Sequence, residues 1–148
     1  MTTPEHEDVV DVLLEQHGLV KEMFGRVHAA EADTKAKLFD DLVYLLATHE
    51  AGEQKTVHVV MRDQVTDGGE VAEARVAEET EATEALAELK ALGVDAPGFQ
   101  DKFDMFHQAV LAHATHEEED EFPRLRQLIP AEKLHMMAGE LRSIQAMQ

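Results

Sequence analysis

The segment His113-Ala-Thr-His-Glu117-Glu-Glu-Asp-Glu-Phe-Pro123 and the earlier segment His49-Glu-Ala-Gly-Glu53 set the architecture expected of this chain. In each segment a histidine and a glutamate stand four residues apart, so an α-helix would place both side chains on one face, one turn apart. An imidazole and a carboxylate placed in this way can bind one cation together. The rest of the sequence predicts helices that bring these two pairs to the same place.

Composition restricts the possible partners. The chain has 148 residues, which is the size of one domain (1–148), with 31 acidic residues against 13 basic ones and a formal net charge of -18. A surface this negative repels phosphate, so we expect neither nucleic acid nor a membrane as a partner. There is no cysteine, which excludes disulfides and thiolate metal sites and leaves nitrogen and oxygen as metal ligands.

Targeting signals are not expected either. The N-terminal segment 1–6 lacks the basic and apolar regions of a signal peptide, and no apolar run is long enough to cross a bilayer. The sequence therefore predicts a cytoplasmic protein.

Apolar residues recur at intervals of three and four, the period of an amphipathic helix. Asp67-Gly-Gly69, Gly93 and two prolines, Pro123 and Pro130, mark breaks or bends. The sequence thus predicts an all-α protein, an antiparallel up-down-up-down four-helix bundle with a short C-terminal helix that caps it or meets a second subunit in a weak homodimer. The expected helices span about 8–32, 34–62, 70–92 and 99–128, followed by the short helix at about 131–146.

Polar residues interrupt these apolar stripes at one height. In an antiparallel pair joined by a tight turn, residues equally far from the turn lie side by side. His17 lies 15 residues before Ala32, and His49 lies 16 residues after Asp33. The same counting around the later breaks gives one layer of three histidines and three carboxylates: His17, His49, Glu53, Glu79, His113 and Glu117.

Such a layer needs compensating charge, because burying an unpaired charge is strongly unfavourable. Cations would supply it. Six ligands are too many for one tetrahedral zinc ion, but they suit two iron or manganese ions bridged by carboxylates.

Three motifs together resemble those of the hemerythrin-like HHE cation-binding domains, over nearly the whole chain. They are Asp8-Val-Val-Asp-Val-Leu-Leu-Glu-Gln-His17, His49-Glu-x-x-Glu53 and His113-x-x-x-Glu117-Glu-x-x-x-Phe-Pro123. The resemblance implies two iron ions joined by an oxo or hydroxo group. It also implies that His17 and His49 hold one iron, that His113 holds the other, and that Glu53 and Glu117 bridge both.

The third helix departs from the family pattern. The family usually has a histidine where this chain has Glu79, although a shift of one residue in register would choose Glu78 instead. An anionic oxygen in place of a neutral nitrogen favours ferric iron. This change makes reversible oxygen carriage less expected than redox chemistry with peroxide or dioxygen.

Four further residues flank the layer. Glu50 is a possible additional ligand, although it points about a hundred degrees away from the stripe of His49. His116 or Glu118 could transfer protons. His116 and His58 flank the layer and could contact the ligands or transfer protons, but we expect both to be partly exposed.

Three functions are compatible with these features. The leading hypothesis is a di-iron oxidoreductase that disproportionates hydrogen peroxide, as a catalase does. The alternative is a non-catalytic module that binds or senses dioxygen, nitric oxide or iron. A third interpretation is a metal-free helical adaptor whose histidines act as pH switches.

Overall fold

The segments with a helical period in the sequence form helices in the structure. The structure, a computed structural model, describes residues 7–148; segment 1–6, and with it the signal-peptide prediction, lies outside the described residues. Within residues 7–148 the chain forms only helices and connecting turns, which confirms the all-α prediction for this part. In chain order the elements are α1 (Val9–Ala29), α2 (Ala32–Lys55), α3 (Val57–Gln64), α4 (Gly68–Leu92), α5 (Phe99–His116), the π-helical segment η2 (Glu117–Glu121), α6 (Phe122–Leu128) and α7 (Ala131–Ala146).

Asp8 fixes the start of α1. Its carboxylate accepts a hydrogen bond from the Asp11 backbone N–H at 2.8 Å, and the Asp11 carboxylate accepts one from the Asp8 N–H at 3.1 Å. This reciprocal cap satisfies N–H groups that have no partner inside the helix. Arg126 of α6 donates to both carboxylates, at 3.1 and 2.7 Å. The start of α1 is therefore also tied to α6.

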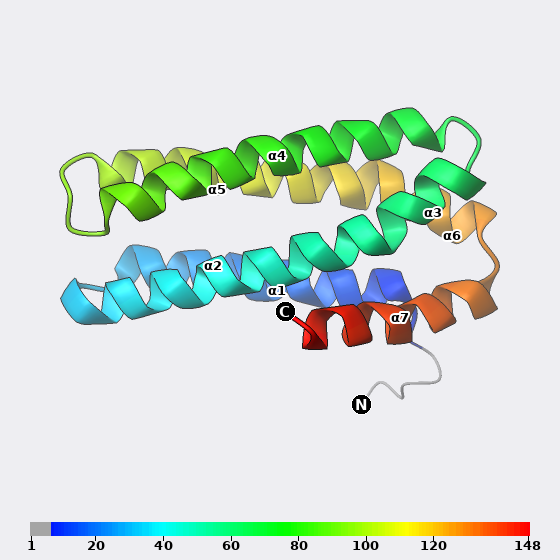
Figure 1. The fold of residues 1–148 in the computed structure, drawn as a ribbon, viewed down its shortest axis with the longest axis horizontal. Coiled ribbons are helices and arrows are strands. Elements are labelled where there is room, and N and C mark those ends of the chain that lie inside the picture. The colour runs from blue at the N-terminus through cyan, green and yellow to red at the C-terminus, as the bar shows by residue number, and fades with distance from the viewer. Residues whose placement is uncertain (1–6) are drawn as a thin grey trace.

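The long helices form two layers (Figure 1). One layer contains α1 and α2, which are joined only by Ala30 and Glu31, and the other contains α4 and α5. The turn between α4 and α5 is bounded by Gly93 and Gly98, whose φ angles of 88° and 87° lie in the region that favours glycine. In Figure 1, α3 rises from the end of α2 towards the start of α4, and α7 lies along α1 and α2.

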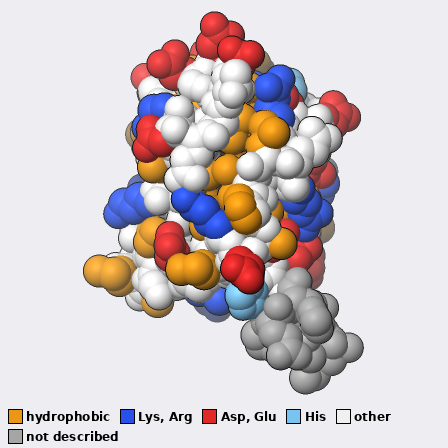
Figure 2. Space-filling view, turned by 90° about the vertical axis from the view of Figure 1, so that its right-hand side faces the viewer, with side chains coloured by type: hydrophobic (Ala, Val, Ile, Leu, Met, Phe, Trp, Pro, Cys, Tyr) orange, Lys and Arg blue, Asp and Glu red, His pale blue; other side chains and the backbone are white. Residues whose placement is uncertain are grey.

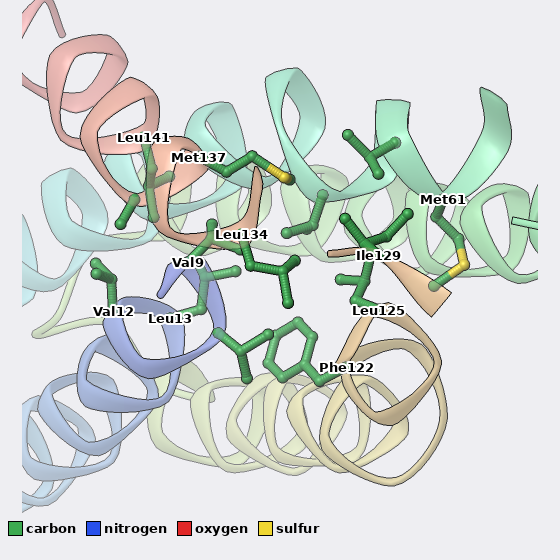
Figure 3. Packing of buried hydrophobic residues seen from close by; sticks show 14 of the residues in the cluster. Val9, Val12, Leu13, Met61, Phe122, Leu125, Ile129, Leu134, Met137 and Leu141 are labelled. Atoms are coloured by element: carbon green, nitrogen blue, oxygen red, sulfur yellow. The ribbon is translucent and has the colours of Figure 1, made fainter. Parts of the chain in front are cut away.

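Two apolar clusters fill the interior, one towards each end of the long helices. Figure 3 shows the first, in which Leu13, Phe122 and Leu125 pack with Met137 and other residues of α3 and α7. The second is rich in phenylalanine and is built around the buried rings of Phe24, Phe39, Phe99, Phe103 and Phe106. In α1 the first cluster ends at Leu13 and the second begins at Val20. His17, between them, therefore lies in a layer that both clusters enclose.

The helix expected over 34–62 is divided in two. At Thr56 the backbone leaves the helical region (φ −122°, ψ −85°), and the Thr56 hydroxyl donates to the Gly52 carbonyl at 2.7 Å. The expected helix at 99–128 continues through a wider π-helical turn at Glu117–Glu121, just before Pro123. Proline has no N–H to donate, and a wider turn is one way in which a helix accommodates that loss.

Charged side chains of both signs lie on the end of the molecule that carries the α3–α4 turn. Figure 2, which views the end that carries the α3–α4 turn, shows acidic, basic and apolar side chains interspersed. Among the described helices, none combines the length and the hydropathy needed to cross a membrane.

Gly52 tests the packing of α7 on α2. A Cβ atom at Gly52 would overlap the buried Leu141 side chain of α7 and lie 2.9 Å from Gln145 Nε2, whereas a Cβ at Gly25 of α1 meets nothing within 4 Å. Both replacements by alanine gain helix propensity, but only Gly52→Ala forces repacking, which typically costs about 1–3 kcal/mol. We expect urea denaturation to give Gly52→Ala a free energy of unfolding lower than that of Gly25→Ala by about this amount. Equal stabilities would show that α7 does not pack here.

Candidate metal centre

A layer of buried polar side chains lies between the two apolar clusters. The elements α1 to α5 and η2 all contribute to it, so the layer depends on the whole fold. Its buried members are His17, His49, Glu53, His58, Glu79, Glu117 and Glu121, and His113, which is 14% exposed, completes it.

The first group of potential ligands comes from α1, α2 and η2. His17 Nε2 lies 3.1 Å from Glu117 Oε1, and His49 Nε2 lies 3.1 Å from Glu53 Oε1. One ligand atom from each of these four residues lies within 4.8 Å of every other. All four side chains are buried, so a cation between them would be shielded from solvent.

The second group shares two members with the first. His113 Nε2 lies 3.2 Å from Glu79 Oε2, 3.6 Å from Glu117 Oε2 and 3.9 Å from Glu53 Oε1. These four residues also satisfy the 4.8 Å condition. Glu53 and Glu117 therefore stand between the two groups, and each has two oxygens to offer.

The inward atoms of this layer fit a cation better than they fit one another. Both oxygens of Glu53 and of Glu117, together with Nε2 of His17 and of His113, are buried and have no hydrogen-bond partner among the described residues. Burial and the negative charge of Glu53 raise the pKa of Glu117 well above its ordinary value. Leaving such groups unpaired is costly. Bound cations would satisfy these atoms and favour the ionised form of both carboxylates.

Each of the three imidazoles is oriented by an acceptor on its outer side. His17 Nδ1 lies 2.7 Å from Glu118 Oε2, His49 Nδ1 lies 2.7 Å from Gln16 Oε1, and His113 Nδ1 lies 2.9 Å from Glu78 Oε1. These acceptors favour the tautomer with the proton on Nδ1. The Nε2 lone pair is then directed into the layer, the arrangement that metal-binding histidines require.

Comparison with known proteins agrees with this geometry. The family model described as the hemerythrin HHE cation-binding domain matches residues 8–125. The chain belongs to this family. The family is described by cation binding, and the histidine and glutamate groups described above could hold a metal ion.

The fold of this HHE domain has a counterpart among solved structures. It is similar to the crystal structure of a hemerythrin HHE cation-binding domain-containing protein from Mycobacterium kansasii, with a TM-score of 0.86 and 21% sequence identity. The similarity covers 95% of this chain and 86% of that one. None of the curated protein sequences matches the chain.

The HHE domain places the predicted third-helix carboxylate in the layer. Glu79 is 4% exposed and faces His113, whereas Glu78 is 27% exposed and lies on the outer side of that histidine. Glu78 also lies 2.6 Å from Nδ1 of His116, which is 48% exposed, as the sequence suggested. The register that favours Glu79 over Glu78 is thus the one the structure adopts.

Glu50 and Glu118 lie beside the two groups rather than in them. Glu50 accepts a hydrogen bond from the Thr83 hydroxyl at 3.2 Å, and its pKa is raised by burial and by the charge of Glu79. Glu118 is hydrogen-bonded to His17 and is partly exposed.

The expectation for His58 is wrong. This histidine is fully buried, with Nδ1 2.8 Å from Glu121 Oε2 and Nε2 2.8 Å from Glu79 Oε2. On an uninterrupted helix His58 would face away from Glu53, five residues earlier, but the break at Thr56 turns it inward. With Glu117 and Glu121 it forms a third group of possible ligands. The burial of His58 was not predicted because the sequence analysis treated 34–62 as one uninterrupted helix.

The buried His58 predicts a pH dependence of the metal-free protein. Burial lowers its pKa, but hydrogen bonds to Glu121 and Glu79 outweigh burial and raise the pKa to about 10. Its contribution to stability is therefore complete below the ordinary value of 6.5 and is lost as the pH rises through about 10. We expect urea titrations of protein stripped of metal by a chelator to show that its free energy of unfolding falls as the pH rises from 6.5 to about 10.

Two variants isolate the contribution of His58. His58→Gln should show a shallower fall than the wild type, while His28→Gln, at an exposed position, should retain the full slope. Some slope persists in every variant, because the pKa of His113 is raised to about 11 and acts with the same sign. Identical slopes for His58→Gln and wild type would contradict the prediction.

Proposed function

We propose that this protein binds two iron ions in its histidine and glutamate layer. His17 and His49 hold one ion, His113 and Glu79 hold the other, and Glu53 and Glu117 are shared. The observation that carries the proposal is that two ligand groups meet at two buried carboxylates whose oxygens lack partners within residues 7–148. We further propose an antiparallel up-down-up-down bundle of four members: α1, α2 together with α3, α4, and α5. The short connections between neighbouring helices support this arrangement.

The ligand types favour iron or manganese over zinc. Three imidazole nitrogens and three carboxylates, shared between two positions, exceed what a tetrahedral zinc site uses. Carboxylate-rich sets suit harder ions, and Glu79 adds an anionic oxygen where a further imidazole would favour the softer ferrous state. We therefore propose iron that cycles through its ferric state.

The reaction we propose is the disproportionation of two molecules of hydrogen peroxide to two of water and one of dioxygen. A bound iron pair supplies the capacity to accept and return two electrons. Two series of hydrogen-bonded side chains support a role in proton transfer. One links His113 through Glu78 to the exposed His116, with separations of 2.9 and 2.6 Å, and the other links His17 to the partly exposed Glu118 at 2.7 Å. We propose that His116 and Glu118 exchange protons with solvent in this way.

A second candidate is a module that binds or senses dioxygen or nitric oxide. The observation that favours it is a largely apolar cavity that adjoins His17, His49 and His113. Apolar diatomic gases partition into such cavities more readily than hydrogen peroxide does. The two candidates differ in whether the small molecule is released unchanged.

Metal content tests the shared carboxylates. We expect elemental analysis of protein expressed with added iron to find two iron ions per chain in the wild type and at most one in Glu117→Gln. Glutamine keeps the size of Glu117 but removes its charge and replaces one oxygen with an NH2 group that can donate to Glu53, so the metal-free variant should fold. Glu119→Gln, an exposed neighbour on the same segment, is the control and should retain both ions. Full iron occupancy in Glu117→Gln would refute the shared site.

Oxygen evolution tests the reaction. Iron-loaded wild-type protein should release dioxygen from hydrogen peroxide at an electrode, and His116→Gln should slow release by about 10²-fold or more if His116 transfers protons. His135→Gln, at an exposed histidine remote in sequence from the layer, should behave as wild type. An iron-loaded wild type that evolves no dioxygen, but changes its absorption reversibly under dioxygen, would replace the enzyme proposal with the binding module.

A further inference from the structure

A cavity of about 290 Å³ lies between the α1–α2 and α4–α5 layers, beside the proposed metal centre. Its polar end is formed by ligand side chains, among them His17, His49, Glu53 and His113. Away from that end its walls come from all four long helices and are mostly apolar, although Lys21 and Lys90 also line the cavity. The apolar residues include Val43, Leu46, Leu86, Phe106, Val110 and Leu111. The cavity thus joins an apolar compartment to a reactive polar end.

The cavity is larger than hydrogen peroxide or dioxygen requires. One water molecule occupies about 30 Å³ of liquid, and a dry apolar cavity of about 150 Å³ is enough to bind benzene. Water in the apolar part would find few hydrogen-bond partners on these walls. A ligand that fills the space therefore needs an apolar body of several carbon atoms.

Small side chains provide a route into the cavity between α2 and α4. Ala47 of α2 and Thr83 and Ala87 of α4 line the cavity and are exposed to solvent. The Thr83 hydroxyl, on this exposed side, donates to the Glu50 carboxylate at 3.2 Å and so links α4 to α2 beside the ligand layer. A linear molecule entering here would meet the polar layer with one end while its remaining length contacts apolar side chains.

We propose that this cavity binds the alkyl chain of an organic hydroperoxide, with the peroxide group at the His17, His49 and His113 end. The identity of the head group rests on the proposed peroxide function, whereas binding of the chain depends only on the cavity. A hydroperoxide has a small oxygen head group that suits the polar end and an alkyl chain that suits the walls. Hydrogen peroxide uses only the polar end and gains nothing from the apolar part.

Primary alcohols test the proposal because they carry the same alkyl chain and a similar oxygen head but do not react. We would titrate the iron-loaded protein with the series from ethanol to 1-octanol by isothermal calorimetry. Each buried methylene should tighten binding about fourfold, and the increase should stop once the chain fills the cavity. Affinities that do not depend on chain length in the wild type would overturn the proposal, and this comparison needs no variant.

A matched pair of variants on α4 locates the binding site. Ala82 lines the cavity, whereas Ala77 is exposed and lines no part of it. Ala82→Leu should weaken 1-octanol binding by more than about tenfold, and its affinity should stop rising with added methylenes at a shorter alcohol than in the wild type. Ala77→Leu should bind the alcohols as the wild type does. Equal weakening, or none, in the two folded variants would overturn the assignment to this cavity.

The same preparations separate this proposal from the function it extends. Iron content and oxygen evolution from hydrogen peroxide are measured alongside alcohol binding. If the protein takes up no iron but binds alcohols with an affinity that depends on chain length, the metal centre is refuted and the alkyl site is retained. Two iron ions and oxygen evolution without alkyl binding would refute the alkyl site and retain the metal centre.

Discussion

The burial of two carboxylates side by side is the constraint on which the rest of this structure depends. Glu53 and Glu117 are at most 1% exposed, and their oxygens have no hydrogen-bond donors among residues 7–148. Two ionised carboxylates this close and this buried need compensating positive charge, and without it the pKa of Glu117 is raised. Imidazole nitrogens face the carboxylates from four helices, α1, α2, α3 and α5. The two apolar clusters, one on each side of the polar layer along the helices, limit the access of water to the carboxylates.

The helical period explains why much of the layer could be predicted. His17, His49, Glu53, Glu79, His113 and Glu117 meet because residues equally far from a tight turn lie at the same height in paired helices. That calculation needs only a uniform rise per residue and short connections. It fails where the helix is interrupted, so His58 was misplaced by the break at Thr56.

The outer partners of the histidines could not be predicted in this way. Glu118, Gln16 and Glu78 reach Nδ1 atoms through flexible side chains whose conformations depend on packing that no sequence period records.

The link between α7 and the metal layer could not be predicted from the helical period either. Gln145 exchanges hydrogen bonds of 2.8 and 2.9 Å with Gln16, so a helix beyond the family match at residues 8–125 helps to position His49. Packing of α7 and geometry of the metal layer are thereby linked.

X-ray absorption spectroscopy of the iron-loaded protein tests the central claim most directly, because it detects whether one carboxylate pair serves two ions at once. Shared ligation by Glu53 and Glu117 predicts an iron–iron scattering contribution at about 3.5–4 Å, the separation of two-metal sites. It also predicts first neighbours that are nitrogen and oxygen only, since the chain has no cysteine. A spectrum of isolated iron ions, with no iron–iron contribution in fully loaded protein, would contradict the account.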